Sequence, residues 1–340
     1  MLKDPDGRYA RQILFAGIGE EGQSRLRASV AAIVGCGALG AFQAGALARA
    51  GVGRLLLIDR DYVEWSNLQR QWLYDEEDAR SGWPKAAAAA RHIARINSEI
   101  AAEAHIADLA PDNVSDLLAG AHVVLDGTDN FETRYLLNDW CVDREVPWIY
   151  GGAVGSEGIA MPVLPGQTAC FECVYPQPPA GPQPTCETAG VVNVITSLVA
   201  SCQAAIALKL LAGHPDQVEP RITVVDVWTG VLRQCDMPPP DPHCPACADR
   251  SFRHLRGEGR PPISLCGRNA VQIHDRRQSV DLKVLKTRLS PLGEVRANEF
   301  ALRFQAGGYE MTVFPDGRAI IKGTTDLGVA RGLYSRYIGN

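Results

Sequence analysis

The chain has 340 residues, of which 46% are hydrophobic and 21% charged. This composition is typical of a globular protein, and the length has room for one large α/β domain and a small one or for two medium domains. The net charge of −5 argues against a nucleic-acid surface, which needs a basic stripe. No secretory signal is visible at the N-terminus, so a cytoplasmic location is expected. Ten cysteines then predict metal binding or thiol chemistry rather than disulfides, because the cytosol keeps thiols reduced.

The first predicted elements surround a glycine-rich turn. Residues 31–34 form an apolar strand, residues 41–50 an Ala-rich helix, and residues 55–58 a second strand that ends at Asp59. Backbone amides in such a turn can contact a phosphate, and the acid after the second strand can bind a ribose hydroxyl. The pattern predicts a nucleotide site without specifying the nucleotide. The turn residues are Gly35, Gly37, Ala38 and Gly40.

A loop rich in polar and aromatic side chains follows Asp59, and such a loop beside a phosphate turn is a candidate for ligand contacts. Pro84 then begins a helix, since its missing N–H costs nothing in the first turn. Lys85 therefore lies at the positive end of the helix dipole, which is unfavourable for a cation. A phosphate bound there would remove this mismatch.

Residues 122–130 form a strand that runs into a turn with two carboxylates. Ligands bind at this edge of a parallel sheet, so Asp129 is a candidate contact to Mg²⁺ or substrate, while Asp126 is expected to hold the turn. Together with Arg70 and Lys85, Asp129 suits a triphosphate with Mg²⁺ better than a dinucleotide. No GxxxxGK[ST] loop occurs, so we predict ATP on a Rossmann-type turn.

The remaining pattern completes the predicted fold. From about residue 159 the sequence favours antiparallel strands. Polar side chains interrupt the apolar residues 191–213, which favours a buried helix over a membrane span. The predicted fold class is α/β, a Rossmann-like mixed sheet with helices on both faces and a zinc knuckle, plus a small C-terminal α+β domain.

A more basic, less Ala-rich composition begins near Ser251 and predicts a domain boundary there. The predicted domains are residues 1–250, which bind ATP and zinc, and residues 251–340, to which we assign no role. Within the second domain, an Asp-Gly turn between alternating strands predicts a hairpin over residues 309–323. A closing helix is expected near residues 326–337.

Two Cys-x-x-Cys pairs lie far apart in the sequence, and both are flanked by prolines. Each pair presents two thiolates from one tight turn, and two pairs make the tetrahedral site of a structural zinc ion. Such a site says little about activity, because four protein ligands leave no open position for water. The predicted ligands are Cys170, Cys173, Cys244 and Cys247.

Cys186 differs from the other cysteines, because it lies in a polar loop flanked by Pro and Gly just before a helix. That setting can lower the pKa of a thiol. Loop cysteines without an adjacent base are often inert. The sequence is therefore equally consistent with a reactive thiol at Cys186 and with a loop cysteine that has no chemical role.

Several motifs together resemble the ThiF/MoeB adenylyltransferases, which are bacterial relatives of ubiquitin-activating enzymes. The resemblance covers about residues 8–250, and the C-terminal part is similar to the extension of Bacillus-type members rather than to a rhodanese domain. The motifs are Arg8-Tyr-Ala-Arg11-Gln, the glycine turn with Asp59, Trp65-Ser-Asn-Leu-Gln-Arg70-Gln, Pro84-Lys85, Asp126-Gly-Thr-Asp129-Asn130, the two cysteine pairs and Thr185-Cys186-Glu-Thr-Ala-Gly.

The resemblance implies ATP-dependent adenylation of the C-terminal Gly-Gly carboxylate of a small ubiquitin-like sulfur carrier protein, with a cysteine desulfurase or another sulfur donor acting beside it. It also implies a homodimer in which Arg11 reaches the partner subunit's site. It implies that Asp59 holds the ribose, that Ser66, Asn67, Arg70 and Lys85 hold the phosphates, that Asp129 lies at Mg²⁺ and that Asn130 belongs to the nucleotide site. The predicted catalytic residues are Arg11, Arg70, Lys85 and Asp129, with Cys186 as a candidate sulfur-transfer thiol.

Two other functions fit parts of the sequence. An NAD-dependent oxidoreductase would use the same glycine turn, but it would leave Arg70 and Lys85 unexplained, and no catalytic His or Tyr-Lys pair is evident near the site. A non-catalytic protein that only binds a ubiquitin-like partner is the third interpretation. The sequence does not distinguish a thiamine-thiazole type of carrier from a molybdopterin type.

Overall fold

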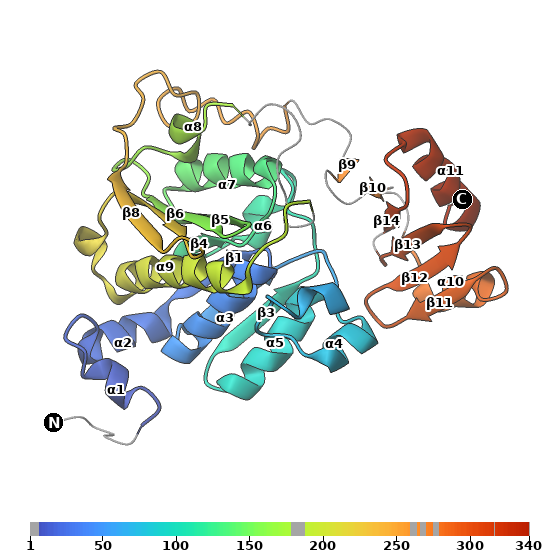
Figure 1. Cartoon of the computed structure of the whole chain (residues 1–340), viewed down its shortest axis with the longest axis horizontal. Coiled ribbons are helices and arrows are strands. Elements are labelled where there is room, and N and C mark those ends of the chain that lie inside the picture. Colours follow the sequence, from blue (N-terminus) through green and yellow to red (C-terminus); the bar gives the residue numbers. More distant parts are fainter. Residues whose placement is uncertain are drawn as a thin grey trace. The chain divides into compact units, whose positions relative to one another are not determined.

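The computed structural model describes residues 7–177, 188–258, 264–265, 270–274, 279–315 and 317–339. The chain forms two compact units, residues 1–258 and 259–340 (Figure 1). This division places the boundary after residue 258, whereas the composition predicts it near Ser251. Residues 251–258 therefore group with the first unit. They are fastened to it by backbone N–H groups of His254 and Leu255, which donate to the buried carboxylate of Asp139 at 2.8 and 3.1 Å.

The first unit is built on an eight-stranded sheet with the order β3-β2-β1-β4-β5-β6-β7-β8. Neighbours from β3 to β5 are parallel, and neighbours from β5 to β8 are antiparallel. The predicted change to antiparallel strands is confirmed. The strands are β1 (Val30–Val34), β2 (Arg54–Ile58), β3 (Ala101–His105), β4 (Val123–Asp126), β5 (Trp148–Val154), β6 (Glu157–Val163), β7 (Arg221–Asp226) and β8 (Val231–Asp236).

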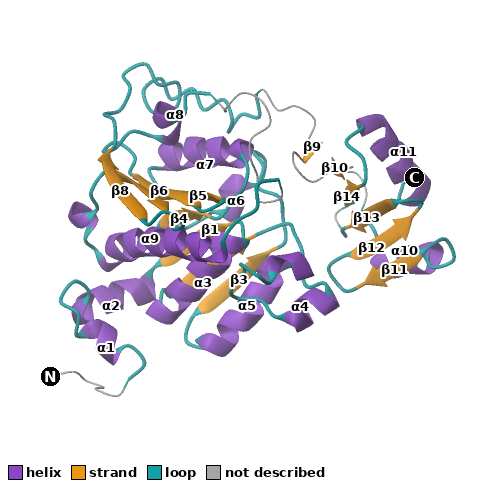
Figure 2. Ribbon diagram, viewed as in Figure 1, coloured by secondary structure: helices purple, strands orange, loops and turns teal. Residues whose placement is uncertain are grey.

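Helices cover both faces of this sheet, as Figure 2 shows. Ala31 and Ile33 of β1 pack with α2, α3, α5 and α9, whereas Ala32 and Val34 pack with α6 and α7. Alternate residues of one strand thus enter two cores, which confirms the Rossmann-like mixed sheet. The helices are α1 (Ala10–Ile13), α2 (Gly19–Ala28), α3 (Ala38–Ala50), α4 (Glu76–Ser81), α5 (Lys85–Ile96), α6 (Val114–Leu117), α7 (Phe131–Arg144), α8 (Phe171–Val174) and α9 (Asn193–Ala212), with 3₁₀ turns η1 (Trp65–Asn67) and η2 (Pro215–Gln217).

Helix α9 is, among the described residues, the one helix long and apolar enough to cross a membrane. Its side chains Ile195, Val199 and Ala207 are fully buried or nearly so inside the first unit. The helix also packs along α3 and β5. These contacts are those of a core helix, as the sequence predicts.

The second unit has an antiparallel six-stranded sheet with the order β11-β12-β13-β14-β10-β9, and it has a hydrophobic core of its own. The predicted hairpin is confirmed by the pairing of β13 with β14, and the predicted closing helix is α11. The elements are β9 (Ser264–Leu265), β10 (Ala270–His274), α10 (Leu282–Leu289), β11 (Glu294–Ala297), β12 (Leu302–Ala306), β13 (Tyr309–Val313), β14 (Arg318–Lys322) and α11 (Leu327–Tyr337).

Candidate active site

The glycine turn connects β1 to α3 at the C-terminal edge of the parallel strands. Gly35 has a φ of +86°, and a Cβ on it would lie 2.6 Å from the carbonyl oxygen of Gly127. A Cβ on Gly40 would lie 1.8 Å from the carbonyl oxygen of Gly35. Gly37 is different, since a Cβ there would have its nearest neighbour, Nε2 of Gln71, at 3.9 Å. Gly35 and Gly40 therefore permit close packing, while the turn is open at Gly37, where a phosphate can approach its amides.

Helix α3 begins at Ala38, inside the glycine motif, and not at residue 41 as the sequence pattern suggested. Gly37 is the N-cap, and the N–H of Ala41 donates to its carbonyl oxygen at 2.9 Å. The remaining amides of the turn thus lie at a helix N-terminus, where they have no partner within the helix.

Asp59 follows β2 directly and is 9% exposed. One carboxylate oxygen accepts from the N–H of Cys36 and the other from the N–H of Asp61, both at 2.6 Å. Burial raises the pKa of Asp59, although the charge of Lys85 opposes the shift. Each oxygen can still accept a second hydrogen bond, as binding of a ribose hydroxyl requires.

Lys85 is the first residue of α5, and it is only 5% exposed. Its Nζ lies 3.1 Å from Oδ2 of Asp61, and its backbone N–H donates to the carbonyl oxygen of Asp61 at 2.8 Å. The carbonyl oxygen of Lys85 accepts from the hydroxyl of Tyr74 at 3.1 Å. The structure thus links Lys85 to Asp59 through Asp61.

The loop after Asp59 contains the other predicted phosphate contacts. Asn67 is buried, and its Oδ1 accepts from the N–H of Glu64 at 3.0 Å in the capping box of η1. Nη1 of Arg70 donates to the carbonyl oxygen of Ser66 at 2.8 Å, and the side chain of Ser66 is exposed. These bonds give the loop one defined shape, and the roles of the three side chains toward phosphate stay predictions.

The turn after β4 is held by Asp126, as predicted. One oxygen of its buried carboxylate accepts from the N–H and hydroxyl of Thr128, at 2.8 and 2.6 Å, and the other accepts from Nε of Arg134 at 3.1 Å. Asp129 follows the turn with an exposed side chain. Asn130 is the N-cap of α7, and its side chain accepts from the N–H of Thr133 at 2.9 Å. The role of Asp129 toward Mg²⁺ and that of Asn130 toward the nucleotide are not tested by these contacts.

The side-chain amides of two buried glutamines hydrogen-bond to the backbone of this turn, and the sequence analysis did not predict either residue. Nε2 of Gln43 donates to Oε1 of Gln203 at 2.6 Å and to the carbonyl oxygen of Asp126 at 3.1 Å. Nε2 of Gln203 donates to the carbonyl oxygens of Asp126 and Ile149, both at 2.9 Å. The sequence does contain one signal for them, since each is a polar residue within an Ala-rich apolar helix.

Two predicted catalytic residues remain, Arg11 and Cys186. Arg11 is in α1, and its side chain is exposed. Cys186 lies outside the described residues. The suggested roles of Arg11 in a partner's site and of Cys186 in sulfur transfer therefore stay predictions.

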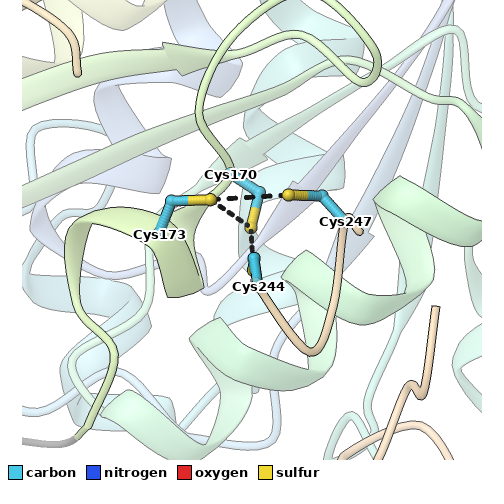
Figure 3. A group of neighbouring side chains, drawn as sticks. All are labelled: Cys170, Cys173, Cys244 and Cys247. Atoms are coloured by element: carbon cyan, nitrogen blue, oxygen red, sulfur yellow. Dashed lines mark hydrogen bonds between the residues drawn. The ribbon is translucent and has the colours of Figure 1, made fainter. Parts of the chain in front are cut away.

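The four predicted zinc ligands come together from α8 and from the segment after β8. Their sulfur atoms point toward one another (Figure 3), with Cys170 to Cys244 at 3.5 Å, Cys173 to Cys247 at 3.4 Å and Cys170 to Cys173 at 3.7 Å. A tetrahedral zinc ion with bonds of about 2.3 Å separates its sulfur ligands by about 3.8 Å. The cluster is compatible with zinc.

Two neighbouring groups donate hydrogen bonds to sulfur atoms of the cluster. The N–H of Asp241 donates to Sγ of Cys173 at 3.4 Å, and Nδ2 of Asn138 donates to Sγ of Cys170 at 3.7 Å. Hydrogen bonding from Cys170 lowers the pKa of Cys173 to about 5, and the same hydrogen bond raises the pKa of Cys170, while burial raises the pKa of Cys247. Such donors around thiolates are usual at structural metal sites.

The fold and site define a nucleotide-binding α/β protein, with a glycine turn at the edge of a parallel sheet, an acid after the next strand and a buried lysine beside both. The model of the ThiF family matches residues 9–246. The chain belongs to this family.

Relatives extend the likeness to the whole chain. It is 41% identical to a sulfur carrier protein ThiS adenylyltransferase of Bacillus subtilis, covering 98% of this chain and 99% of that protein. It is 36% identical to a sulfur carrier protein adenylyltransferase of Thermus thermophilus, covering 73% of this chain and 92% of that protein. A crystal structure of E. coli MccB with MccA-N7isoASN has the same fold, with a TM-score of 0.63 at 22% identity over 73% of this chain and 75% of that one.

Proposed function

We propose that this protein adenylates the C-terminal glycine carboxylate of a small ubiquitin-like sulfur carrier protein, using ATP and Mg²⁺. The observation that carries the proposal is the open glycine turn joined by hydrogen bonds to Asp59 and Lys85. Family membership and the names of the relatives support the same reaction.

In the proposed complex, Asp59 accepts from the ribose, and the amides around Gly37 contact the phosphates. Ser66, Asn67, Arg70 and Lys85 supply further phosphate contacts. Asp129 would hold Mg²⁺, which neutralises charge on the triphosphate when bound. The fit rests on the chemistry of these donors and on the space left free at Gly37.

The reaction is an in-line displacement. An oxygen of the carrier carboxylate bonds to the α-phosphorus, the bond from that phosphorus to the bridging oxygen breaks, and pyrophosphate leaves with the electron pair. The carboxylate is a weak nucleophile that the triphosphate repels. The protein therefore contributes mainly alignment and neutralisation of the leaving group, and no covalent protein nucleophile is required.

The carrier is proposed to be of the ThiS type. The relative matched along nearly the full chain, the second unit included, carries that name. The alternative is a molybdopterin-type carrier. Measuring adenylation of the two carriers side by side would distinguish them. Sulfur would then be delivered to the adenylated carrier by a cysteine desulfurase or another donor, with Cys186 as the candidate thiol on this chain.

The working form is proposed to be a cytoplasmic homodimer with a structural zinc ion in each subunit. Leu14 and Phe15 next to α1 are 70% and 66% exposed, and a second copy of the chain would cover them. Arg11 in the same region would then reach the partner's site. The four cysteines would ligate zinc fully, which leaves no position for catalysis.

The test is exchange of labelled pyrophosphate into ATP in the presence of Mg²⁺ and a ThiS-type carrier ending in Gly-Gly. We expect exchange with this carrier and none with a carrier that lacks the last glycine. Replacing Lys85 or Arg70 by alanine should lower the exchange rate by about two to three orders of magnitude. Protection from heat by NADH and not by Mg-ATP would instead support an oxidoreductase, and ATP binding without exchange would indicate a non-catalytic binder.

A further inference from the structure

A closed ring of hydrogen bonds joins the glycine turn to Lys85. The N–H groups of Cys36 and Asp61 bind the two oxygens of Asp59, each at 2.6 Å. The N–H of Lys85 binds the carbonyl oxygen of Asp61 at 2.8 Å. The hydroxyl of Tyr74 completes the ring, because it lies 2.7 Å from the carbonyl oxygen of Cys36 and 3.1 Å from that of Lys85.

Tyr74 is the member that ties the glycine turn directly to α5. It is 8% exposed, and its single phenolic hydrogen is shared between two buried carbonyl oxygens. Burial raises the pKa of Tyr74 well above its ordinary value, so the hydroxyl stays protonated and remains a donor. Tyr74 also lies four residues after Arg70, and it therefore anchors the loop that carries the predicted phosphate contacts.

Asp61 makes two further hydrogen bonds to the same lysine. It holds the backbone of Lys85 through its carbonyl oxygen and holds Nζ through Oδ2 at 3.1 Å. The charge of Lys85 also acts on Asp59, where it opposes the rise in pKa caused by burial, and the carboxylate of Asp59 binds the glycine turn through Cys36.

We propose that Tyr74 is a positioning residue for adenylation, which with Asp61 sets the place of Lys85 relative to the glycine turn. The inference rests on the proposed function, since Lys85 acts on phosphates bound at that turn. Tyr74 itself touches no reacting atom. Its hydroxyl matters because a displacement of about 1 Å in a catalytic group can cost up to about a hundredfold in rate.

The experiment measures carrier-dependent exchange of pyrophosphate into ATP for the full chain and for Tyr74→Phe, which keeps the ring and removes the hydroxyl. We expect kcat to fall about tenfold with KM for ATP changed by less than about twofold, because binding of ATP uses many contacts and alignment of Lys85 matters most in the transition state. An unchanged kcat in an active, folded Tyr74→Phe protein would overturn the proposal.

Tyr135→Phe is the matched control. The hydroxyl of Tyr135 is also a donor to a backbone carbonyl, that of Tyr175 at 2.7 Å, and the residue is 2% exposed in α7. Both variants should lose similar thermal stability, but Tyr135→Phe should keep the kcat of the unmodified chain. An equal fall of kcat in both variants would show a general structural effect and contradict the positioning role.

A second variant keeps the test valid if Tyr74→Phe does not fold. Asp61→Asn leaves the backbone bonds in place and removes the charge beside Nζ of Lys85, and it too should lower kcat about tenfold. If both variants fold, their double mutant should lose less than the product of the two single losses, since both act through Lys85. If the fall of kcat in the double mutant equals the product of the two single falls, Tyr74 and Asp61 do not act through the same lysine. Failure of the unmodified chain to exchange with any carrier would instead reject the proposed function.

Discussion

The three glycines of the nucleotide turn have different roles. Gly35 and Gly40 are required because backbone atoms leave no room for a Cβ, whereas Gly37 borders open space. A GxGxxG pattern alone does not assign these roles, since all three residues are the same letter. The distinction depends on backbone neighbours that the pattern does not show, since Gly35 packs against the carbonyl group of Gly127 and Gly40 packs against that of Gly35.

These roles predict that one alanine substitution affects stability and another affects nucleotide binding. Gly40→Ala should destabilise the first unit by about 2–3 kcal/mol because the Cβ overlaps a backbone oxygen. Gly37→Ala should leave the melting temperature almost unchanged but weaken Mg-ATP binding about tenfold, by obstructing the amides of the turn. Thermal melting with and without Mg-ATP measures both effects. A Gly37→Ala protein that binds Mg-ATP normally would place the nucleotide elsewhere.

Single residues were also where prediction from sequence failed. The positions of Asp59, Lys85 and Asp126 could be predicted, because Asp59 follows a strand, Asp126 ends one and Lys85 begins a helix. Tyr74, Gln43 and Gln203 do not lie at such positions. Tyr74 binds Cys36, 38 residues away in the chain, and Gln43 binds Gln203, 160 residues away. Their function depends on tertiary packing, which a single sequence does not display.

At the scale of elements, α4 is fastened to α5 through one buried carboxylate. Asp78 is fully buried, and its oxygens bind Nε2 of His92 at 2.6 Å and the guanidinium of Arg91. Burial alone would raise the pKa of Asp78, but His92, the N–H of Asp75 and Arg91 outweigh it and lower the pKa. The contact orients the helix that begins with Lys85.

This contact predicts a pH dependence of stability. Because the folded protein lowers the pKa of Asp78, its contribution is fully present above the unfolded pKa of about 3.9 and is lost as pH falls through the folded value. The Asp78→Asn variant should therefore melt below the unmodified chain near neutral pH, and the difference should shrink as pH approaches 3. A difference that stays constant with pH would assign the effect to packing rather than to ionisation.

The cysteine cluster was predictable because each pair has a local spacing that prepares it for a metal. Stripping zinc with a chelator, or replacing Cys244 by serine, should lower the free energy of unfolding by about 5 kcal/mol or more, since metal binding is coupled to folding. Cys235→Ser is the matched control, because Cys235 is exposed on β8 outside the cluster. Metal analysis and thermal melting measure the effect, and an unchanged melting temperature without metal would argue against a structural role.

At the scale of the whole molecule, the chain divides into two units that have separate hydrophobic cores. The first unit has cores on both faces of its sheet, and the second has one around residues of β12, β13, β14 and α11. The second unit is also basic, with 13 Lys and Arg residues against 7 Asp and Glu residues in the sequence 259–340, although the whole chain is acidic. Its hairpin and closing helix were predictable from local patterns, but nothing in those patterns indicates a task.

Separate cores predict separate melting. Calorimetry of the full chain should resolve two transitions, and Mg-ATP at about 100 times its Kd should raise only that of the first unit, by about 5–10 °C. A single transition that moves as a whole with Mg-ATP would show that the units unfold together.

The cysteine cluster has a further consequence for the chain between its two halves. Paired sulfur atoms lie 74 residues apart in sequence, so a bound zinc ion would enclose α9, β7 and β8 in one loop. A cross-link over a loop of that length restricts the unfolded chain by about 4 kcal/mol in the chain-entropy description of disulfides. Zinc bound to the four cysteines would place this restriction on the segment that contains β7 and β8, without any disulfide bond.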